Sequence, residues 1–444
     1  MKYYSTNGTA PIADLHKAVV KGLAEDRGLY MPEKIKTLPQ VFFDDIEKLS
    51  FQDIAYNVAS AFFGEDVDLD ALKDIVYDTL SFDCPVVQVK ENIYTLELFH
   101  GPTLAFKDVG ARFMARLLRY FTQSNQNTQN NLINVLVATS GDTGSAVANG
   151  FLGVEGIHVY VLYPKGKVSP IQECQFTTLG KNITAIEVDG VFDDCQALVK
   201  SAFMDEELNQ HMKLTSANSI NVARFLPQAF YYFNAYARMK ALGKADNFVM
   251  CVPSGNFGNI CSALFGHAMG LPVKRFIAAN NANDIVYKYL QTGKYEPKAS
   301  VQTLANAMDV GDPSNFARII NLYSQNNKLT PEATHHRITN LISGATYSDA
   351  QIREIMRQCY QETGYILDPH GATGYQALVD SLQPGEIGVF CETAHPAKFK
   401  EKVDDILSID VEIPDRLAAF MKGEKQSVPM TKNFEDFKKY LMQQ

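Results

Sequence analysis

Apolar and polar positions follow two different periods along the chain. Residues 53–64 and 68–82 carry apolar side chains three and four positions apart, which predicts amphipathic helices. From about residue 131 the pattern changes to short, β-rich apolar runs that alternate with glycine-containing turns and helical stretches. The chain is therefore expected to begin with a helical domain and to continue as an α/β protein.

The strand–turn–helix pattern occurs in two series separated by a long helical stretch, residues 219–243. The apolar runs of the first series are 131–140, 157–164 and 183–190. The strand-to-helix segments of the second series are 247–259, 274–284 and 386–399. Serial units of this kind predict parallel sheets covered by helices. We therefore expect two parallel-sheet α/β domains behind the helical one.

Domain boundaries follow from these patterns. A helical N-terminal domain is expected over residues 1–95, and a smaller α/β domain over residues 131–222. The larger α/β domain combines residues 96–130 with residues 223–444. Within it, the segment from about 291 to 350 is polar and irregular and is expected to be an insertion.

Composition excludes several classes of protein. Apolar residues make up 46% and charged residues 20% of the 444 positions, as in ordinary globular proteins. The net charge of −9 argues against a general nucleic-acid-binding protein. We expect no secretory signal and no membrane span, because no apolar run reaches about 18 residues. The seven cysteines form no CxxC pair and the histidines are scattered, so we expect reduced thiols in the cytoplasm and no metal site.

One lysine occupies an unfavourable position. A helical pattern begins near Leu104, and at about 100° per residue Lys107 projects beside Met114 and Leu118 in the apolar arc. It also lies in the first turn, where the helix dipole disfavours a cation. Its long stem could carry the charge to water. Alternatively, burial and the helix end lower its pKa and keep the amine neutral, as Schiff-base chemistry requires.

Two strand-to-helix turns present backbone amides to anions. The first contains glycines that permit close backbone approach, and it suits a phosphate, although a tight turn without a ligand has the same pattern. Its residues are Ser254, Gly255, Asn256, Phe257, Gly258 and Asn259. The second turn suits a carboxylate, although its aspartate or threonine could serve only as a helix N-cap. Its residues are Ser140, Gly141, Asp142 and Thr143.

A third strand end carries Thr393, which by itself indicates little. The similar turn 366–375 is expected to form a wall of the site. A reactive lysine and a phosphate-binding turn together suit a cofactor that has both an aldehyde and a phosphate. Pyridoxal phosphate is such a cofactor, and it would attach covalently at Lys107 and through its phosphate at residues 254–259.

Four segments resemble motifs of the threonine synthases, fold-type II pyridoxal-phosphate enzymes, in the branch found in fungi and enteric bacteria. They are FHGPTLAFKD, SGDTG, SGNFGN and CETAHPAKF, in the family's order. The resemblance extends from the first residues to about residue 400. It implies a tryptophan-synthase-β-like fold with a mobile smaller domain. It also implies the conversion of O-phospho-L-homoserine and water to L-threonine and phosphate, the last step of threonine biosynthesis.

The resemblance also implies residue roles. Lys107 corresponds to the lysine that binds the cofactor and moves protons, residues 254–259 to the phosphate loop, and Thr393 to the hydroxyl that faces the pyridine nitrogen. Residues 140–143 correspond to the loop that receives the substrate carboxylate. Many fold-type II relatives have asparagine where this chain has Asp142, where an amide contacts the cofactor's phenolic oxygen. That role is not transferred, because a carboxylate would repel an anionic oxygen.

The substrate has a second anionic end, which requires another phosphate site. Residues 213–225 offer polar side chains for it, namely Ser216, Asn218, Asn221 and Arg224. Arginine suits bidentate phosphate binding, but Arg224 could equally form a structural ion pair.

Other functions stay open at this point. A related pyridoxal-phosphate phospholyase or dehydratase would release 2-oxobutyrate. A non-catalytic metabolite-binding protein could have kept the same scaffold. A two-domain protein that binds phosphorylated metabolites without the cofactor could use Lys107 as a plain phosphate contact. The full-length resemblance and the lack of a recognisable C-terminal regulatory domain favour the synthase. No nucleic-acid, membrane or obligate protein partner is expected.

Overall fold

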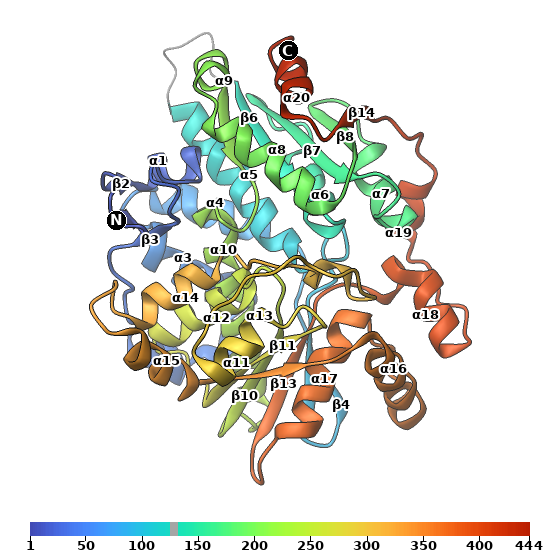
Figure 1. Cartoon of the computed structure of the whole chain (residues 1–444). Coiled ribbons are helices and arrows are strands. Elements are labelled where there is room, and N and C mark those ends of the chain that lie inside the picture. Colours follow the sequence, from blue (N-terminus) through green and yellow to red (C-terminus); the bar gives the residue numbers. More distant parts are fainter. Residues whose placement is uncertain (125–131) are drawn as a thin grey trace.

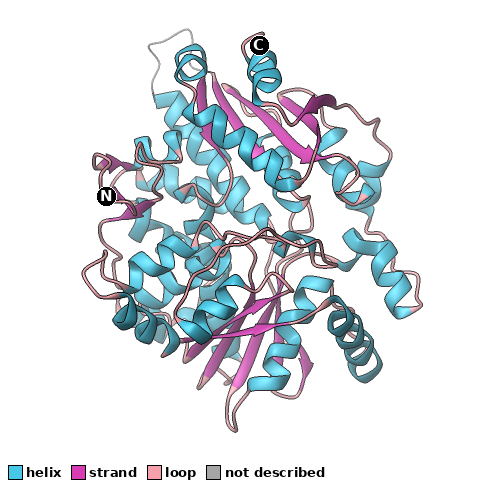
Figure 2. Ribbon diagram, viewed as in Figure 1, coloured by secondary structure: helices cyan, strands magenta, loops and turns pink. Residues whose placement is uncertain are grey.

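The computed structural model describes residues 1–124 and 132–444, and the expected domain boundary at 130/131 lies outside these ranges. Two parallel sheets at opposite ends of the molecule organise the chain, and the N-terminal elements lie along one side of both (Figure 1). Helices pack around both sheets (Figure 2). The predicted pair of parallel-sheet α/β domains is therefore confirmed.

The N-terminal region combines helices with a small antiparallel sheet. The sheet strands are β1 (Lys2–Ser5), β2 (Ala13–Asp14) and β3 (Tyr30–Pro32). The helices are α1 (Leu15–Lys21), α2 (Gln40–Asp44), η1 (Ile46–Lys48), α3 (Phe51–Phe63) and α4 (Leu69–Thr79). Ser50 and Asp68 cap α3 and α4 through side-chain oxygens, and the apolar faces of both helices are buried, as their patterns predict.

The larger sheet has six strands, parallel except for β4. Their order is β12 (Ile342–Thr346), β11 (Arg275–Asn280), β10 (Phe248–Pro253), β13 (Ile387–Glu392), β5 (Ile93–Glu97) and β4 (Val86–Lys90). The central strand β10 is buried at every position, which explains its unbroken apolar run. Associated helices are α11 (Ala229–Ala241), α12 (Gly258–Ala268), α13 (Ile285–Thr292), α16 (Asp349–Thr363) and α17 (Pro369–Ser381). Helix α5 (Lys107–Ser124) packs against α4 and against α6 (Asp142–Phe151) of the smaller α/β region.

The smaller sheet has five parallel strands. Their order is β14 (Val428–Thr431), β8 (Ile183–Asp189), β7 (Ile157–Pro164), β6 (Ile133–Ala138) and β9 (Lys213–Ser216). Its helices are α6 (Asp142–Phe151), α7 (Pro170–Thr177), α8 (Phe192–Met204), α9 (Glu206–His211) and α20 (Phe434–Leu441). Because neighbouring strands run parallel, β4 excepted, the turns that follow them lie at the same edge of each sheet, where they can carry functional groups.

Shorter elements connect these layers. They are α10 (Val222–Phe225), η2 (Leu226–Gln228), η3 (Asn306–Met308), α14 (Phe316–Tyr323), α15 (Pro331–Thr339), η4 (Pro396–Phe399), α18 (Lys400–Leu407) and α19 (Asp415–Met421). Within the described ranges, no helix is both long enough and apolar enough to cross a membrane.

Sheet membership corrects the expected domain division in three places. Strands β4 and β5 belong to the larger sheet, so the N-terminal region ends before residue 86 and not at 95. The expected irregular insertion contains α14, α15 and the sheet-edge strand β12. Strand β14 pairs with β8 of the smaller sheet, although residues 223–444 were assigned to the larger domain. A local apolar pattern indicates a strand, but it does not indicate which sheet the strand joins.

Candidate active site

Three strand ends and the start of one helix meet at a cavity between the two parallel sheets, called here the inner cavity. Its walls include Lys107 at the start of α5, Thr393 after β13, and the turns that follow β6 and β10. The lining residues of those turns are Thr139, Ser140, Thr143, Gly255, Asn256, Phe257, Gly258 and Asn259. The topology thus brings most of the sequence-predicted site residues together.

Lys107 is fixed by a short backbone pairing. Helix α5 begins at Lys107 and not near Leu104, because the preceding backbone pairs with the chain after β13. Ala105 forms a bridge with Ala394, and the Phe106 N–H donates to the Thr393 carbonyl at 2.8 Å. This pairing sets the lysine and the threonine beside one another at the cavity wall.

The Lys107 amine is directed into the inner cavity rather than to bulk water. Within the described residues it has no hydrogen-bond or ion-pair partner, and it lies 5.4 Å from the centre of the Phe106 ring. Burial lowers the pKa of Lys107 to about 8, while Asp142 acts to raise it and the cations Arg224 and Lys398 act to lower it. About a tenth of the amine is therefore neutral at pH 7, far more than for an ordinary lysine.

The turn after β10 leaves helix amides free for an anion. The N-cap of α12 is Phe257, in the left-handed region at φ 63°, and its side chain caps no helix amide. Asn259 Oδ1 accepts a hydrogen bond from the Ile260 N–H at 2.9 Å, so the Gly258 and Asn259 amides are the ones left without a partner among the described residues. A Cβ at Gly255 would lie 2.6 Å from the Ala307 carbonyl oxygen, so only glycine allows this approach. The uncapped helix start suits a phosphate group.

Polar side chains of this turn fix its shape. Asn256 accepts a hydrogen bond from the Ser314 N–H at 2.8 Å, and Asn259 donates to the Pro253 carbonyl at 2.8 Å. Ser254 bonds through its N–H to Ala279 and through its hydroxyl to Val252, and it does not contribute to the described lining of the cavity. The contribution of the turn to a ligand therefore comes mainly from its backbone amides.

The turn after β6 also differs from expectation in detail. Thr139 Oγ1 accepts hydrogen bonds from the Gly141 and Gly144 amides at 2.9 and 2.8 Å, so the cap comes from Thr139 and not from Asp142 or Thr143. Ser140 and Thr143 line the inner cavity, whereas Gly141 and Asp142 are not among the residues described as lining it.

Asp142 is turned away from the cavity. Its Oδ1 lies 2.5 Å from Lys398 Nζ and accepts a hydrogen bond from Gln172 at 2.9 Å. Although burial raises the pKa of Asp142, Lys398 and Lys107 lower it by more, so the carboxylate is ionised. The Asp142 carboxylate is therefore directed at Lys398 and Gln172 and not at a ligand in the inner cavity.

The residues predicted to hold a second phosphate are only partly brought together. Arg224 and Asn218 line the inner cavity, whereas Ser216 lines a second, larger cavity that adjoins it. The Arg224 guanidinium is buried and donates to the Ala217 carbonyl at 2.6 Å, and its Nε has no partner among the described residues. Asn218 is committed to the backbone of Ala138 at 3.0 and 3.3 Å. Asn221 caps α10 instead of facing a ligand.

His370 is a lining residue for which the sequence analysis expected only a wall position. Its Nε2 accepts a hydrogen bond from the Ala307 N–H at 3.1 Å, and its Nδ1 lies 2.6 Å from Asp368 Oδ1. Nδ1 therefore carries the proton, and the ring holds the loop around η3 against the inner cavity. Asp368 also caps α17 through its side chain, and the contact of His370 with Ala307 joins residues 63 positions apart, which no local pattern indicates.

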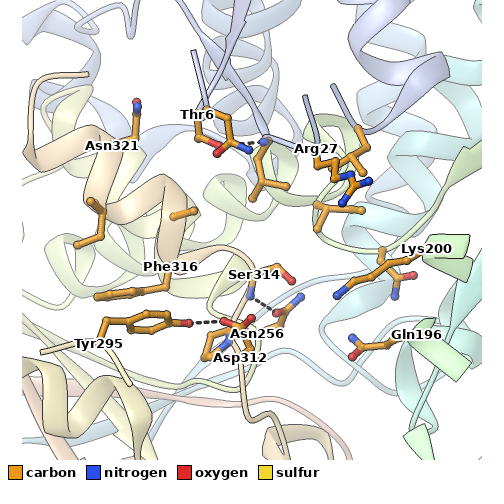
Figure 3. A pocket seen from close by; sticks show the side chains of 18 of the residues that line it. Thr6, Arg27, Gln196, Lys200, Asn256, Tyr295, Asp312, Ser314, Phe316 and Asn321 are labelled. Atoms are coloured by element: carbon orange, nitrogen blue, oxygen red, sulfur yellow. Dashed lines mark hydrogen bonds between the residues drawn. The ribbon is translucent and has the colours of Figure 1, made fainter. Parts of the chain in front are cut away.

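A larger cavity of about 1050 Å³, called here the vestibule, adjoins the inner cavity and shares Ala138, Gln196, Asn218 and Asn256 with it. Figure 3 shows Arg27, Lys200 and Gln196 directed into the vestibule, opposite the hydrogen-bonded pair Tyr295 and Asp312. Within the described residues, Arg27 and Lys200 have no ion-pair partner. Sequence patterns missed both cations, because they come from separate elements.

A free amine facing uncapped helix amides, with a hydroxyl at a third strand end between two parallel sheets, fits a ligand with an aldehyde and a phosphate. This site and fold define a fold-type II pyridoxal-phosphate-dependent enzyme. The profile described as pyridoxal-phosphate dependent enzyme matches residues 78–389. Profiles for the threonine synthase N terminus and C-terminal region match residues 2–80 and 371–441. The chain belongs to the threonine synthase family.

Individual relatives agree over the full length. The threonine synthase of Haemophilus influenzae is 43% identical over 442 residues, covering 100% of both chains. The crystal structure of threonine synthase from Escherichia coli superimposes with a TM-score of 0.92 at 41% identity, covering 100% of both chains. The pyridoxal-phosphate-bound threonine synthase from Brucella melitensis gives a TM-score of 0.90 at 33% identity and covers 100% of this chain and 99% of that chain.

Proposed function

We propose that this enzyme converts O-phospho-L-homoserine and water to L-threonine and phosphate in the cytoplasm, without an obligate protein partner. One observation carries the proposal: the Lys107 amine and the uncapped start of α12 face one cavity in a chain that matches threonine synthases over its whole length. Threonine synthesis from this substrate moves protons at Cα, Cβ and Cγ, expels phosphate from Cγ and adds water at Cβ.

Pyridoxal phosphate is assigned to the inner cavity. Lys107 would hold it covalently, the amides of residues 255–259 would hold its phosphate, and the Thr393 hydroxyl would face its ring nitrogen. When bound, the cofactor supplies an electron sink that acidifies the substrate protons at Cα and Cβ. Two observations support this role for Thr393: it lines the inner cavity, and its hydroxyl has no hydrogen-bond partner among the described residues.

Lys107 is the proton carrier in this proposal. Released from the cofactor, its amine can take the proton from Cα and return a proton at Cγ. A pKa near 8 suits a base that works close to neutral pH, since both protonation states are then populated. Arg224 and Lys398 keep the site electropositive, which opposes reprotonation of the amine.

The two anionic ends of the substrate need separate sites. The start of α6, with the hydroxyls of Ser140 and Thr143, would receive the carboxylate, which the helix dipole also favours. Arg224 and Asn218 would lie nearer the phosphate, with Ser216 on the vestibule side. Closure of the smaller α/β domain over the substrate would then exclude water until the addition step.

Product analysis tests the proposed function. Purified enzyme incubated with O-phosphohomoserine should release threonine and phosphate in equal amounts. Ammonia and 2-oxobutyrate would identify a phospholyase or dehydratase instead. Bound cofactor without turnover of this substrate would support a metabolite-binding protein.

A further inference from the structure

Lys398 is a fully buried lysine whose only part in the mechanism above is the positive charge that it adds near Lys107. It lies in η4, five residues after the strand end at Thr393, and its side chain is inaccessible to solvent. Its Nζ contacts Asp142 Oδ1 at 2.5 Å and donates to the Thr103 carbonyl at 2.8 Å. A buried ammonium group is costly unless it is paired, so this contact requires an explanation.

The carboxylate partner is held as firmly as the lysine. Asp142 is the first residue of α6 and also accepts a hydrogen bond from Gln172 of α7. The preceding Gly141 has φ 144°, and a Cβ there would lie 2.5 Å from the Gln172 amide carbon. A glycine at this position therefore leaves the space in which Gln172 can reach the carboxylate.

The ion pair crosses the boundary between the two α/β regions. Asp142 and Gln172 belong to helices of the smaller sheet, whereas Lys398 follows β13 of the larger sheet. Further bonds follow the same boundary: Gln175 donates to the Thr103 carbonyl at 3.1 Å, and Ser169 donates to the Lys398 carbonyl at 3.1 Å. The position of α6 relative to the larger sheet is thus tied to this contact.

The pair also acts on the reactive amine. The charged groups that influence Lys107 are Asp142 from α6, Arg224 from α10 and Lys398 from η4. Asp142 acts to raise the pKa of Lys107, and the two cations act to lower it. Without Lys398, an unbalanced carboxylate would hold Lys107 as an ammonium ion, which does not attack an aldehyde.

We propose that Lys398 is a positioning residue that neutralises and orients Asp142 across the domain boundary and so keeps the Lys107 amine available to the cofactor. The inference rests on the proposed function only in that Lys107 carries pyridoxal phosphate. It does not depend on which substrate the enzyme uses.

The test compares Lys398→Met, Asp142→Asn and the double variant with the parent. The readout is the pH midpoint of the visible absorbance change of the bond between Lys107 and the cofactor, measured without substrate. Lys398→Met should raise the midpoint by about one unit, a tenfold change in proton affinity, because only the carboxylate remains. Asp142→Asn should lower it, because the cations are then unopposed. The double variant should return to within about 0.3 units of the parent.

A second readout needs no cofactor. In cofactor-free protein, the rate at which Lys107 is reductively methylated should follow the same order across pH, measured by peptide mass spectrometry. Lys400→Met is the matched control, because Lys400 also pairs with carboxylates, Asp404 and Asp410, but at the surface. It should leave both readouts unchanged.

Two outcomes would overturn the proposal. In the first, both single variants have the midpoint of the parent, and in the second, both midpoints move in the same direction. Either would show that the ion pair is only a structural contact. If Lys398→Met does not fold, Asp142→Asn and the double variant still decide. In Asp142→Asn the lysine left without its carboxylate can lose its proton, and the double variant buries neither charge. A different experiment tests the proposed function. If that function is wrong, borohydride reduction should attach the cofactor to no lysine, or to a lysine other than Lys107.

Discussion

At the scale of single residues, the Lys107 amine has no hydrogen-bond or ion-pair partner in the part of the chain that the structure describes, and it has two cationic neighbours, Arg224 and Lys398. Substitution by alanine removes the group that holds the cofactor covalently and the base at Cα. We expect Lys107→Ala to fold, to bind pyridoxal phosphate weakly through residues 255–259, and to lose threonine formation by at least about 10³-fold. Phosphate release assays and absorbance spectra measure both effects. Turnover within tenfold of the parent would contradict the assignment of Lys107.

The pKa of Lys107 gives a pH prediction. Only the neutral amine attacks an aldehyde, and its fraction grows as pH rises toward the pKa of about 8. Cofactor capture by cofactor-free enzyme should therefore accelerate up to tenfold per pH unit below this value and level off above it. Stopped-flow absorbance measures this rate. A profile that is flat between pH 6 and 8 would show that the amine is already neutral throughout.

Part of the site could be predicted from local sequence and part could not. Lys107 and residues 255–259 lie in short segments whose residue types already indicate their chemistry, whereas the role of Thr393 was indicated only by the family resemblance. The orientation of Asp142 depends on Lys398, which is 256 positions away, and no local pattern links them. The same holds for His370 and the η3 loop.

At the scale of elements, the turn into α12 depends on a close backbone contact. A Cβ at Gly255 would lie 2.6 Å from the Ala307 carbonyl oxygen and 2.8 Å from Met308 Cα, and backbone cannot move aside as a flexible side chain can. Gly255→Ala should therefore displace the η3 loop or the turn and weaken cofactor binding at least about tenfold. Fluorescence titration with pyridoxal phosphate measures the affinity.

Gly266→Ala is the control for this substitution. Gly266 lies in the same helix, α12, and a Cβ there would meet only side-chain atoms, the nearest being Phe233 at 3.1 Å. Its cofactor affinity should stay within about twofold of the parent. Equal affinities in both variants would show that the contact with Ala307 does not shape the phosphate site.

The sequence predicted which segments form helices and strands better than it predicted which segments pair with one another. The apolar periods of α3, α4, β6, β7 and β10 agree with the predicted helices and strands, since each pattern reports burial of its own segment. The helix start at Lys107 was misplaced because Ala105 and Phe106 pair with residues beyond β13, a contact between distant segments.

At the scale of the whole molecule, three regions enclose the vestibule: the N-terminal elements, helix α8 of the smaller sheet, and the segment around α14. Such a space could not be anticipated from any one segment. The return of β14 to the smaller sheet is another example, because its four residues carry no signal for the partner strand.

The charges of the vestibule give the last prediction. Arg27 and Lys200 face the space through which a doubly anionic substrate would reach the inner cavity, and Asp312 lies opposite with its carboxylate bonded to Tyr295. Unpaired cations at a cavity mouth attract anions and raise the rate of association. Lys200→Met should lower kcat/KM for O-phosphohomoserine about three- to tenfold, mainly through KM, with kcat nearly unchanged.

Ionic strength separates this attraction from a local packing defect. Screening by salt weakens long-range attraction, so the difference between parent and Lys200→Met should shrink as salt rises toward about 0.5 M. Lys167→Met removes an exposed lysine that lines neither cavity and should leave kcat/KM unchanged at every salt concentration. A loss in Lys200→Met that is independent of salt, or one that falls on kcat, would place this lysine in the packing of α8 and not in the capture of substrate.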